Sequence, residues 1–550
     1  MNKFKYSILT AGIAAMGLMT GACSDSFLDV SSKTESNTEN FYKTEGDAWR
    51  ALIGCYDGWR QVSSNPGIGF YIASTVMSDE AFGGAGIGDG YNYQAIDGFD
   101  IGKSPSDQNM YEQDWKVYYA GVYRCNELIA HEEQIAWESE SNRALYMGEC
   151  HALRALLYFD MVRLWGNIPL FLEPTSENRE QANPDDVYAA IVEDLKYAAD
   201  NIPAGANLGT ANNGRVTKYA AEALLARVFL FYTGYYGKDL AGLTKAEVLA
   251  YLDDVVSSGQ YSLVQEFKSL WPAASLVPVE GKNEWDPEKS TYAGAANSEF
   301  ILQMKFTPTQ DYNGNNDSNR WQVLLGMRSL NFSPYGKGWG IGTATPAYAA
   351  RYAANDPRLA ATFINLAGEG VAASPDYSAS VKDWREFTGF CNKKYSPIAF
   401  PDGLNASRPD GSGDFQITNS QDWVIMRYAD VLLMVAELGG VPSMSAQDAL
   451  DAVRSRAGQP SVPATFENVM NERALELAFE GHRYWDLLRQ GVEKAADAIA
   501  ATAGPVKTGG LDAAVSYDRP KIIATRGLSQ IPLNQINLSN GVLHQNAGWE

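Results

Sequence analysis

The sequence predicts a mainly α-helical protein in which tetratricopeptide-like helix pairs support a large, irregular, loop-rich region. Two observations lead to this prediction. Segments with helical periodicity follow one another in lengths of about 12 to 20 residues, as in helical repeat proteins. Between some of them lie long stretches crowded with Gly, Asn, Asp and Ser. The expected helices cover residues 46–62, 110–137, 142–165, 185–201, 216–235, 245–258, 421–439, 446–457 and 465–490.

Residues 216–235 show the helical pattern clearly. Ala220, Ala223, Leu224 and Val228 recur at helical spacing, with further small residues between them. Small side chains let neighbouring helices approach closely, so this pattern favours helices packed in pairs. The strict repeat consensus is absent, and any repeats are therefore degenerate.

The stretch NERALELAFEGHRYWDLLRQ, residues 471–490, concentrates charge in the last expected helix. Its apolar residues share one face of such a helix and are expected in the core: Leu475, Ala478, Phe479, Trp485 and Leu488. Three charged residues are spaced for ion pairs along another face: Glu476, Glu480 and Arg483. The remaining polar groups, including His482 and Asp486, are expected to bond to Arg427 and Glu437 of the helix predicted over 421–439. The stretch therefore indicates a scaffold rather than an active site.

Loop-rich sequence covers residues 64–109, about 260–420 and 501–550. The middle segment contains one short apolar run, EFILQMKF at Glu299–Phe306, which predicts a strand. Long ordered loops on a rigid scaffold commonly carry binding residues. We therefore divide the mature chain into three parts. They are a helical block at 41–260 with an early binding loop at 64–109, a ligand-binding insertion at 261–420, and a C-terminal helical block at 421–550.

The N-terminus has the pattern of an exported lipoprotein. Residues 1–22 place two lysines before a short apolar stretch, as in a secretory signal peptide. Cys23 follows two small residues, which predicts diacylation of its thiol, with residues 23–40 as a polar tether. Thr20 stands where Leu is usual, and ordinary cleavage with an incidental Cys23 is the alternative. No later run is long and apolar enough to span a bilayer, so this lipid is the expected membrane attachment.

Charge and motifs exclude several classes of function. The net charge of -22 repels phosphate backbones, so nucleic-acid binding is not expected. No dinucleotide, phosphate-loop or zinc-peptidase motif occurs, so no cofactor is expected. Four widely spaced cysteines without a CxxC pair favour buried apolar roles over a zinc or disulfide framework. They are Cys55, Cys125, Cys150 and Cys391.

Residues 311–322 begin like a calcium loop and then depart from it. Asp311, Asn313 and Asn315 match its first ligand positions. Asn316 stands where Gly is required, and Gln322 replaces the bidentate Glu. No metal site is therefore expected, also because the four histidines are not at ligand spacing.

An enzyme hypothesis depends on paired carboxylates. A glycosidase needs two acids that face each other across a cleft. Asp79 and Glu80, in VMSDEAFGG, are the pair to test. The alternative is a polar loop that contacts ligand or caps a helix without any chemistry.

Two segments carry a family resemblance: WVIMRYADVLLMVAE at 423–437 and the charged stretch at 471–490. They resemble the SusD/RagB family of surface glycan-binding lipoproteins. Further family-like segments follow in family order behind the lipoprotein signal and cover nearly the whole chain. They lie at 23–30, 152–170, 214–231, 338–340, 356–359 and 531–549.

The resemblance implies both a fold and a role. Four tetratricopeptide-like helix pairs would support an irregular ligand-binding region. The protein would cap a SusC-like TonB-dependent outer-membrane transporter, facing the cell exterior, as a lid that helps to capture oligosaccharide. Family members bind glycans and do not cleave them, so the resemblance implies no catalytic residues.

Aromatic rings in the loop-rich segments are the candidates for glycan contact. The C–H face of a pyranose stacks on such rings, and its hydroxyls bond to Asn, Asp and Arg side chains. The candidate rings are Tyr91, Tyr93, Trp285, Tyr292, Trp321 and Tyr335, and the nearest polar partners are Asp89, Asn319 and Arg320. The competing role of each ring is loop packing. Trp339, inside the family-like GWG, is expected to be structural.

Two other functions stay open at this point. One is a secreted glycoside hydrolase or lyase that uses acids such as Asp79 and Glu80. The other is a structural or adhesive surface protein that uses its helical repeats for protein contacts. The ligand is also open, because the sequence does not name a glycan and a peptide ligand is an alternative.

Overall fold

A computed structural model of the chain describes residues 41–63, 67–279, 285–286, 289–308, 317–399 and 414–550. The predicted signal peptide, Cys23, the tether at 23–40 and the calcium-like positions Asp311, Asn313 and Asn315 lie outside the described residues. Within the described residues, no helix is both long and apolar enough to cross a membrane.

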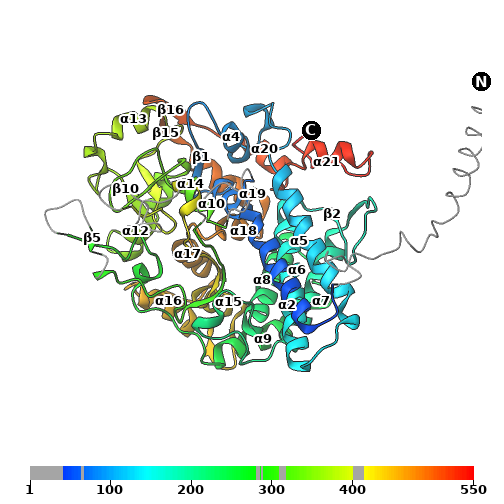
Figure 1. Cartoon of the computed structure of the whole chain (residues 1–550). Coiled ribbons are helices and arrows are strands. Elements are labelled where there is room, and N and C mark those ends of the chain that lie inside the picture. The colour runs from blue at the N-terminus through cyan, green and yellow to red at the C-terminus, as the bar shows by residue number, and fades with distance from the viewer. Residues whose placement is uncertain (1–40, 64–66, 280–284, 287–288, 309–316, 400–413) are drawn as a thin grey trace, which may run out of the picture.

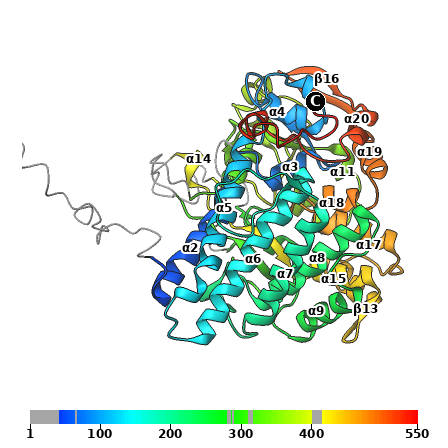
Figure 2. The same cartoon turned by 90° about the vertical axis from the view of Figure 1, so that its right-hand side faces the viewer.

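Long N-terminal helices pack side by side and form one side of the molecule (Figures 1 and 2). Contacts join α2 to α5 and α5 to α6, and then continue through α7 and α8 to α9. The bounds are α2 Glu45–Arg60, α5 Glu112–Ala130, α6 Glu140–Trp165, α7 Pro184–Asn201, α8 Lys218–Tyr236 and α9 Lys245–Ser257. The mainly helical fold and the six helices expected in this block are confirmed, although α5 ends at Ala130 instead of continuing to residue 137.

Local sequence signals fix the ends of these helices. Thr217 caps α8, because its hydroxyl accepts a hydrogen bond from the Ala220 N–H at 3.0 Å. The same helix stops at Gly237, whose φ of 65° lies in the left-handed region that glycine adopts without strain. At α9, Thr244 and Glu247 form a capping box.

Short helices and two-stranded ribbons make up the described part of the middle block (Figure 1). The helices are α10 Arg320–Leu325, α11 Pro346–Ala349, α12 Pro357–Thr362, α13 Tyr377–Lys382 and α14 Phe415–Thr418. The strands are β4 Val277–Pro278 with β5 Trp285–Asp286, β7 Met327–Arg328 with β8 Lys337–Gly338, and β10 Phe363–Asn365 with β11 Phe390–Asn392. The β7–β8 pair is parallel and the other two are antiparallel. This region is irregular, as expected.

The early segment is more regular than the predicted loop over 64–109. It contains α3 Phe70–Val76, β1 Ala81–Gly84 and α4 Tyr91–Asp97. Strand β1 pairs antiparallel with β9, Ile341–Ala344. That partner strand lies about 260 residues further along the chain, which is why local sequence did not reveal the strand.

The predicted helix over 421–439 is wrong in its first part. Residues Trp423–Arg427 form β12, which pairs antiparallel with β6, Phe300–Met304. Helix α15, Tyr428–Leu438, begins directly after it. Every residue of β12 is buried, and apolar periodicity cannot separate a short buried strand from a buried helical turn. The strand predicted over Glu299–Phe306 is confirmed as β6.

The remaining elements complete the C-terminal block and the short ribbons. The helices are α16 Ala446–Arg456, α17 Phe466–Glu476, α18 Arg483–Leu488, α19 Val492–Ala500, α20 Arg519–Ala524 and α21 Leu533–Leu538. The antiparallel ribbons are β2 Ile168–Pro169 with β3 Gln181–Ala182, β13 Gly440–Val441 with β14 Met444–Ser445, and β15 Gly504–Thr508 with β16 Leu511–Val515. One large hydrophobic core runs from Tyr42 to Trp549 and joins most of these elements to the N-terminal helices, whereas Val506 and Val515 of the β15–β16 ribbon belong to a separate small cluster.

The single helix predicted over 465–490 is also wrong, because the chain breaks between α17 and α18. Phe479 has a φ of 60° and Gly481 a φ of 82°, and neither value continues a right-handed helix. The Phe479 N–H is satisfied by the Glu80 carboxylate at 2.7 Å. A Cβ at Gly481 would lie 2.4 Å from the Tyr71 ring, so glycine is required there. The break lets this segment turn toward the core.

The carboxylates of this segment bind a buried arginine. The Arg427 side chain is only 1% exposed. It donates to Glu299 at 2.8 Å, to Glu476 at 2.6 Å and to Glu480 at 2.7 Å. Arg483 instead holds Asp79, with two hydrogen bonds of 2.8 Å. The expected ion pairs along one helix are therefore replaced by tertiary contacts.

The predicted contact between the segments 423–437 and 471–490 is confirmed, although Arg427 binds other residues than His482 and Asp486. Arg427 is bound by Glu476 and Glu480, and Glu437 is bound by Arg489. Asp486 accepts hydrogen bonds from Arg473 and Arg489. His482 is buried beside these groups.

We predict that Arg427→Met destabilises the protein strongly. The change removes the cation that Glu299, Glu476 and Glu480 share, and breaking a buried ion pair costs about 3–5 kcal/mol. The matched control is Arg50→Met, because Arg50 is 64% exposed in its pair with Asp47 and exposed pairs contribute about 0–1 kcal/mol. Thermal unfolding followed by circular dichroism should show a large decrease in melting temperature for Arg427→Met only. Equal melting temperatures for both variants would contradict this role of Arg427.

We predict that His482 makes the protein less stable as the pH falls. Burial lowers the pKa of His482 from 6.5 to about 3, and the nearby Arg227 guanidinium adds to this. Between these two values the unfolded histidine binds a proton that the folded one excludes. Stability is therefore lost as the pH drops from about 6.5 toward 3.

The measurement is the melting temperature from pH 7 to pH 4.5, compared between wild type and His482→Gln. Burial raises the pKa of Glu80 to about 8, which acts in the opposite direction, but Glu80 is present in both proteins. The His482→Gln protein should lose less stability over this range. Parallel pH profiles would show that His482 does not titrate as described.

Candidate functional site

Tyr91 is the candidate ring that is most open to solvent, with 50% of its surface exposed. It is the first residue of α4, directly after Gly90, whose φ is 64°. Its hydroxyl donates a hydrogen bond to the Ile87 carbonyl oxygen at 3.0 Å. The turn before α4 therefore holds the ring at the surface.

A buried arginine supports this ring from one face. The Arg385 guanidinium lies 3.8 Å from the centroid of the Tyr91 ring, which is a cation–π contact. Arg385 is itself fixed by the Ile87 carbonyl at 2.7 Å, the Asp89 carbonyl at 3.0 Å and the Gln94 side chain at 2.7 Å. An aromatic surface held this firmly loses little entropy when a ligand stacks on it.

Two accessible carboxylates lie beside this ring. Arg328 donates to Asp89 at 2.9 Å and to Asp383 at 2.8 Å, so one guanidinium bridges both acids. The Asp89 and Asp383 side chains are 56% and 46% exposed. Each carboxylate therefore keeps oxygen lone pairs that can accept further hydrogen bonds. We call Tyr91, Asp89, Arg328, Asp383 and Arg385 the Tyr91 site.

Glycines make the close contacts of this site possible. A Cβ at Gly86 would lie 2.1 Å from the Arg328 guanidinium, whereas a Cβ at Gly88 would meet nothing within 4 Å. A Cβ at Gly84 would come 2.4 Å from the Gly340 carbonyl oxygen, where β1 approaches β9. The glycines of GGAGIGDG thus allow tight backbone and side-chain packing.

Three of the six candidate rings are buried, and the structure leaves them no open face for a sugar. Trp321 is 0% exposed and packs against Tyr71 and Trp423. Tyr335 is 4% exposed and donates its hydroxyl proton to Glu369. Tyr93 is 7% exposed, and burial raises the pKa of its hydroxyl. Loop placement alone did not separate these core rings from surface rings.

The two polar candidates next to Trp321 are also buried and have structural partners. Asn319 caps α10 by accepting from the Gln322 N–H at 3.1 Å, and it donates to the Gln421 carbonyl at 2.7 Å. Arg320 stacks on Trp339 at 4.5 Å. This contact agrees with the structural role predicted for Trp339.

Trp285 and Tyr292 are partly buried and belong to a different part of the molecule. Trp285, on β5, donates its indole N–H to the Ala399 carbonyl at 3.3 Å. Figure 1 places β5 well away from α4, so the structure does not bring Trp285 to the Tyr91 site. Of the nine predicted residues, only Tyr91 and Asp89 share an accessible surface there.

Two grooves contain aromatic residues that the sequence reasoning missed. One, of about 350 Å³, lies between α5, the segment after β2 and α21, and is lined by Tyr119, Tyr123 and Phe171. The other, of about 390 Å³, is lined by Trp49, Tyr56 and Arg215, with Arg215 over the Trp49 ring at 4.8 Å. These rings lie mostly on helices, where helical spacing favoured an assignment to the core. Tyr123 is half-exposed, which helical spacing alone does not reveal.

The acidic pair of the enzyme hypothesis has structural partners. Asp79 and Glu80 are buried, and they bond to Arg483 and to the Phe479 N–H respectively. Burial raises the pKa of Glu80 to about 8. Both acids hold the early segment against the C-terminal block.

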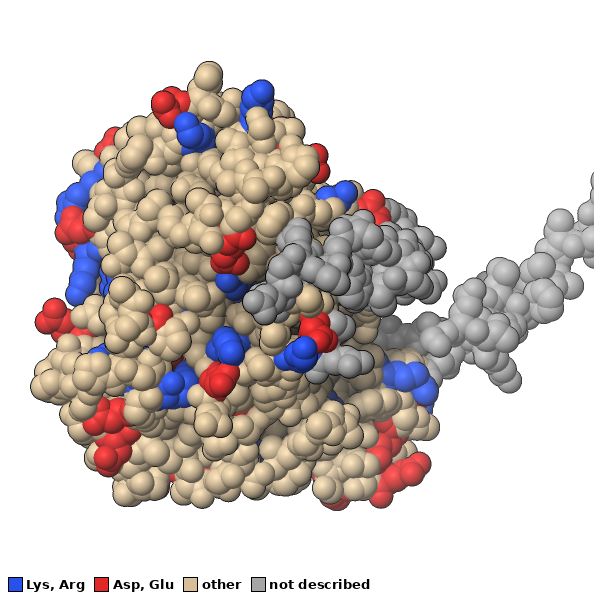
Figure 3. Space-filling view, turned by 90° about the vertical axis from the view of Figure 1, so that its left-hand side faces the viewer, with Lys and Arg blue, Asp and Glu red and all other residues tan. Residues whose placement is uncertain are grey.

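The face on the left of Figure 1 carries scattered charges of both signs, with uncharged surface between them (Figure 3). The elements on that side belong mainly to the middle block. The large negative charge of the chain is therefore not gathered in one patch on the part of this face that the structure describes.

Two family profiles match the chain. The SusD family matches residues 298–549, and a family described as starch-binding and associating with the outer membrane matches residues 26–230. A SusD-like protein of Formosa agariphila is 24% identical over 532 residues, covering 89% of this chain and 92% of that protein. A SusD-like protein of Bacteroides ovatus is 26% identical over 507 residues, covering 86% and 81%.

Solved structures of glycan-binding proteins have a similar fold. A laminarin-binding SusD-like protein superposes with a TM-score of 0.70 at 27% identity, covering 92% of this chain and 99% of that one. Surface glycan-binding protein A of Bacteroides thetaiotaomicron, in complex with laminarihexaose, gives a TM-score of 0.72 at 23% identity, covering 92% and 100%. The profiles, the relatives and the fold agree across both the N-terminal helices and the C-terminal block, and the chain therefore belongs to the SusD family.

Proposed function

We propose that this protein binds oligosaccharides outside the cell and acts as the lid of a SusC-like TonB-dependent transporter. A lipid on Cys23 would anchor it to the outer membrane. The observation that carries the binding function is the likeness to a laminarin-binding SusD-like protein over 92% of the chain. The outer-membrane association is supported by the description of the family that matches residues 26–230.

We place the ligand at the Tyr91 site. The C–H face of a sugar ring would stack on the side of Tyr91 that Arg385 leaves open. Sugar hydroxyls would donate hydrogen bonds to Asp89 and Asp383, whose side chains are half-exposed. Because Arg328 already pairs with both acids and orients them, an uncharged ligand meets no unpaired carboxylate.

The geometry favours binding without cleavage. Asp89 and Asp383 are bridged by one guanidinium, whereas glycoside hydrolysis requires a proton donor and a second carboxylate on opposite sides of the scissile bond. Asp79 and Glu80 are committed to Arg483 and the Phe479 N–H. We therefore propose a binding protein rather than a hydrolase or lyase.

The proposed ligand class is laminarin fragments, because two of the similar structures are described as binding laminarin or laminarihexaose. Titration calorimetry with laminarihexaose should give saturable binding to the wild-type protein. Tyr91→Ala should weaken it at least about tenfold, since tenfold is about 1.4 kcal/mol and a stacked ring contributes energy of this order.

Tyr123→Ala is the matched control, because Tyr123 is 48% exposed on α5 and lies in the groove beside α21. It should bind as wild type does. Loss of binding in Tyr123→Ala but not in Tyr91→Ala would move the site to that groove. Chromatography of the incubated sugar should show no shorter products, and released sugar would support the enzyme hypothesis instead.

We also predict that Gly86→Ala weakens laminarihexaose binding while Gly88→Ala does not. A methyl group at Gly86 would displace the Arg328 guanidinium and with it the orientation of Asp89, whereas Gly88 has open space around it. Calorimetry compares the two variants, and circular dichroism checks that both are folded. Equal affinities would show that the bridge between Arg328 and Asp89 does not shape the site.

A further inference from the structure

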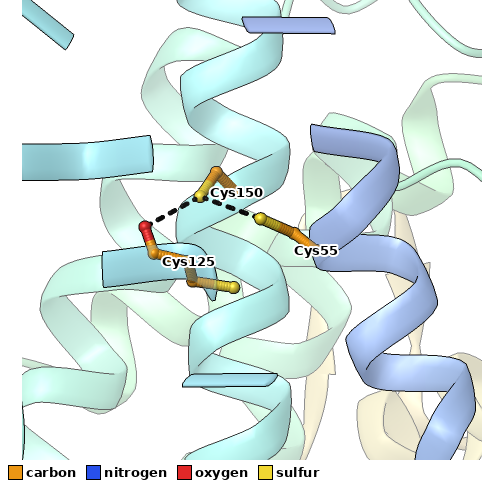
Figure 4. Close-up of side chains that lie close together, drawn as sticks. All are labelled: Cys55, Cys125 and Cys150. Carbon is orange, nitrogen blue, oxygen red and sulfur yellow. Dashed lines mark hydrogen bonds between the residues drawn. The ribbon is translucent and has the colours of Figure 1, made fainter. Parts of the chain in front are cut away.

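Three cysteine side chains converge inside the N-terminal helices (Figure 4). Cys55 comes from α2, Cys125 from α5 and Cys150 from α6. All three are 0% exposed. Their sulfur atoms lie within 4.8 Å of one another, and the Sγ atoms of Cys55 and Cys150 are 4.0 Å apart. Sequence spacing could not reveal this cluster, because each thiol lies on a different helix.

The separations suit three-coordinate binding of one metal ion. A metal–thiolate bond is about 2.3 Å long. Three such bonds in a plane place the sulfur atoms about 4.0 Å apart, by simple trigonometry from that bond length. The observed separation of Cys55 and Cys150 matches this value, and the third sulfur needs to move by less than an ångström to about the same distance.

We propose that Cys55, Cys125 and Cys150 bind a single soft cation, Cu(I), through their three sulfur atoms. Soft thiolate ligands select Cu(I) and Zn(II), but structural zinc sites are almost always four-coordinate. Among the described residues, no His, Asp or Glu side chain joins the group as a fourth ligand. The ligand set therefore favours the ion that accepts three thiolates.

Binding requires the thiols to lose their protons. The thiolate, and not the thiol, is the metal ligand, so metal binding releases the thiol protons. The balanced reaction joins Cu⁺ and three thiols to give a copper tris-thiolate with charge -2 and three released protons. The Arg154 guanidinium, one helical turn after Cys150, places positive charge nearby, where it also binds Asp194 at 2.7 Å. It offsets part of the negative charge of the site.

The site would connect α2 to α5 and α6. α2 lies directly after the segment that leads to Cys23 and contacts both α5 and α6. A metal bound by one residue from each helix binds only the folded state and therefore stabilises it. This inference is independent of the proposed glycan binding.

The test is an anaerobic titration of the reduced, metal-free mature chain with Cu(I) in the presence of a Cu(I) chelator as competitor. Cys23→Ser is present in every sample, so that only the four buried cysteines contribute. The Cys23→Ser protein, which keeps the four buried cysteines, should bind one equivalent of Cu(I) and show copper–sulfur charge-transfer absorption. X-ray absorption should give three sulfur neighbours for the copper. Its melting temperature should rise on binding.

The matched control is Cys391→Ala, because Cys391 is equally buried but lies in a separate hydrophobic cluster. It should bind Cu(I) as tightly as the Cys23→Ser protein does. By contrast, Cys55→Ala, Cys125→Ala and Cys150→Ala should each lower the Cu(I) affinity at least about tenfold, because the two remaining thiolates do not replace the lost one. Circular dichroism verifies that each variant is folded before titration.

Three results would overturn the proposal. One is that the Cys23→Ser protein binds Cu(I) no more tightly than a variant in which Cys55, Cys125 and Cys150 are all replaced by Ala. Another is stoichiometric four-coordinate Zn(II) binding with a preference over Cu(I). The last is a disulfide between Cys55 and Cys150 in the protein as isolated, detected by mass spectrometry and by the loss of two titratable thiols.

Discussion

The buried Arg427 guanidinium is the interaction on which the arrangement of the scaffold depends. An arginine removed from water must be fully compensated, and here Glu299, Glu476 and Glu480 supply the carboxylates. These acids precede β6 and flank the break after α17, so one side chain joins three segments that are distant in sequence. The network continues through Arg358 and Arg456, which also bind Glu476. Replacing any one partner unbalances the charge of this buried network, which makes the set interdependent.

This network also positions the proposed ligand site. The turn at residues 479–483 binds the early segment through Asp79 and Glu80. Strand β1 follows at once and pairs with β9, and the next turn carries Asp89 and Tyr91 onto Arg328 and Arg385. The charged stretch at 471–490 is therefore connected to the proposed ligand site through the scaffold.

The sequence predicted the long helices, the strand at 300–304 and the family, because periodicity and motifs are local properties. It did not predict β12 or the break at Phe479, since both depend on partners that lie far away in the chain. Tyr91 and Trp321 were equal candidates as loop aromatics, yet one is half-exposed and the other is completely buried. Only tertiary packing separates them. The convergence of Cys55, Cys125 and Cys150 likewise results from helix packing.

We propose that a half-exposed tyrosine, with two arginine-paired carboxylates beside it, receives a sugar ring. The most direct measurement is a crystal structure of the protein with laminarihexaose bound. The account predicts a sugar ring stacked on the open face of Tyr91, with hydroxyls within hydrogen-bond distance of Asp89 or Asp383. An oligosaccharide bound in the groove beside α21 or over Trp49, with Tyr91 left free, would contradict it.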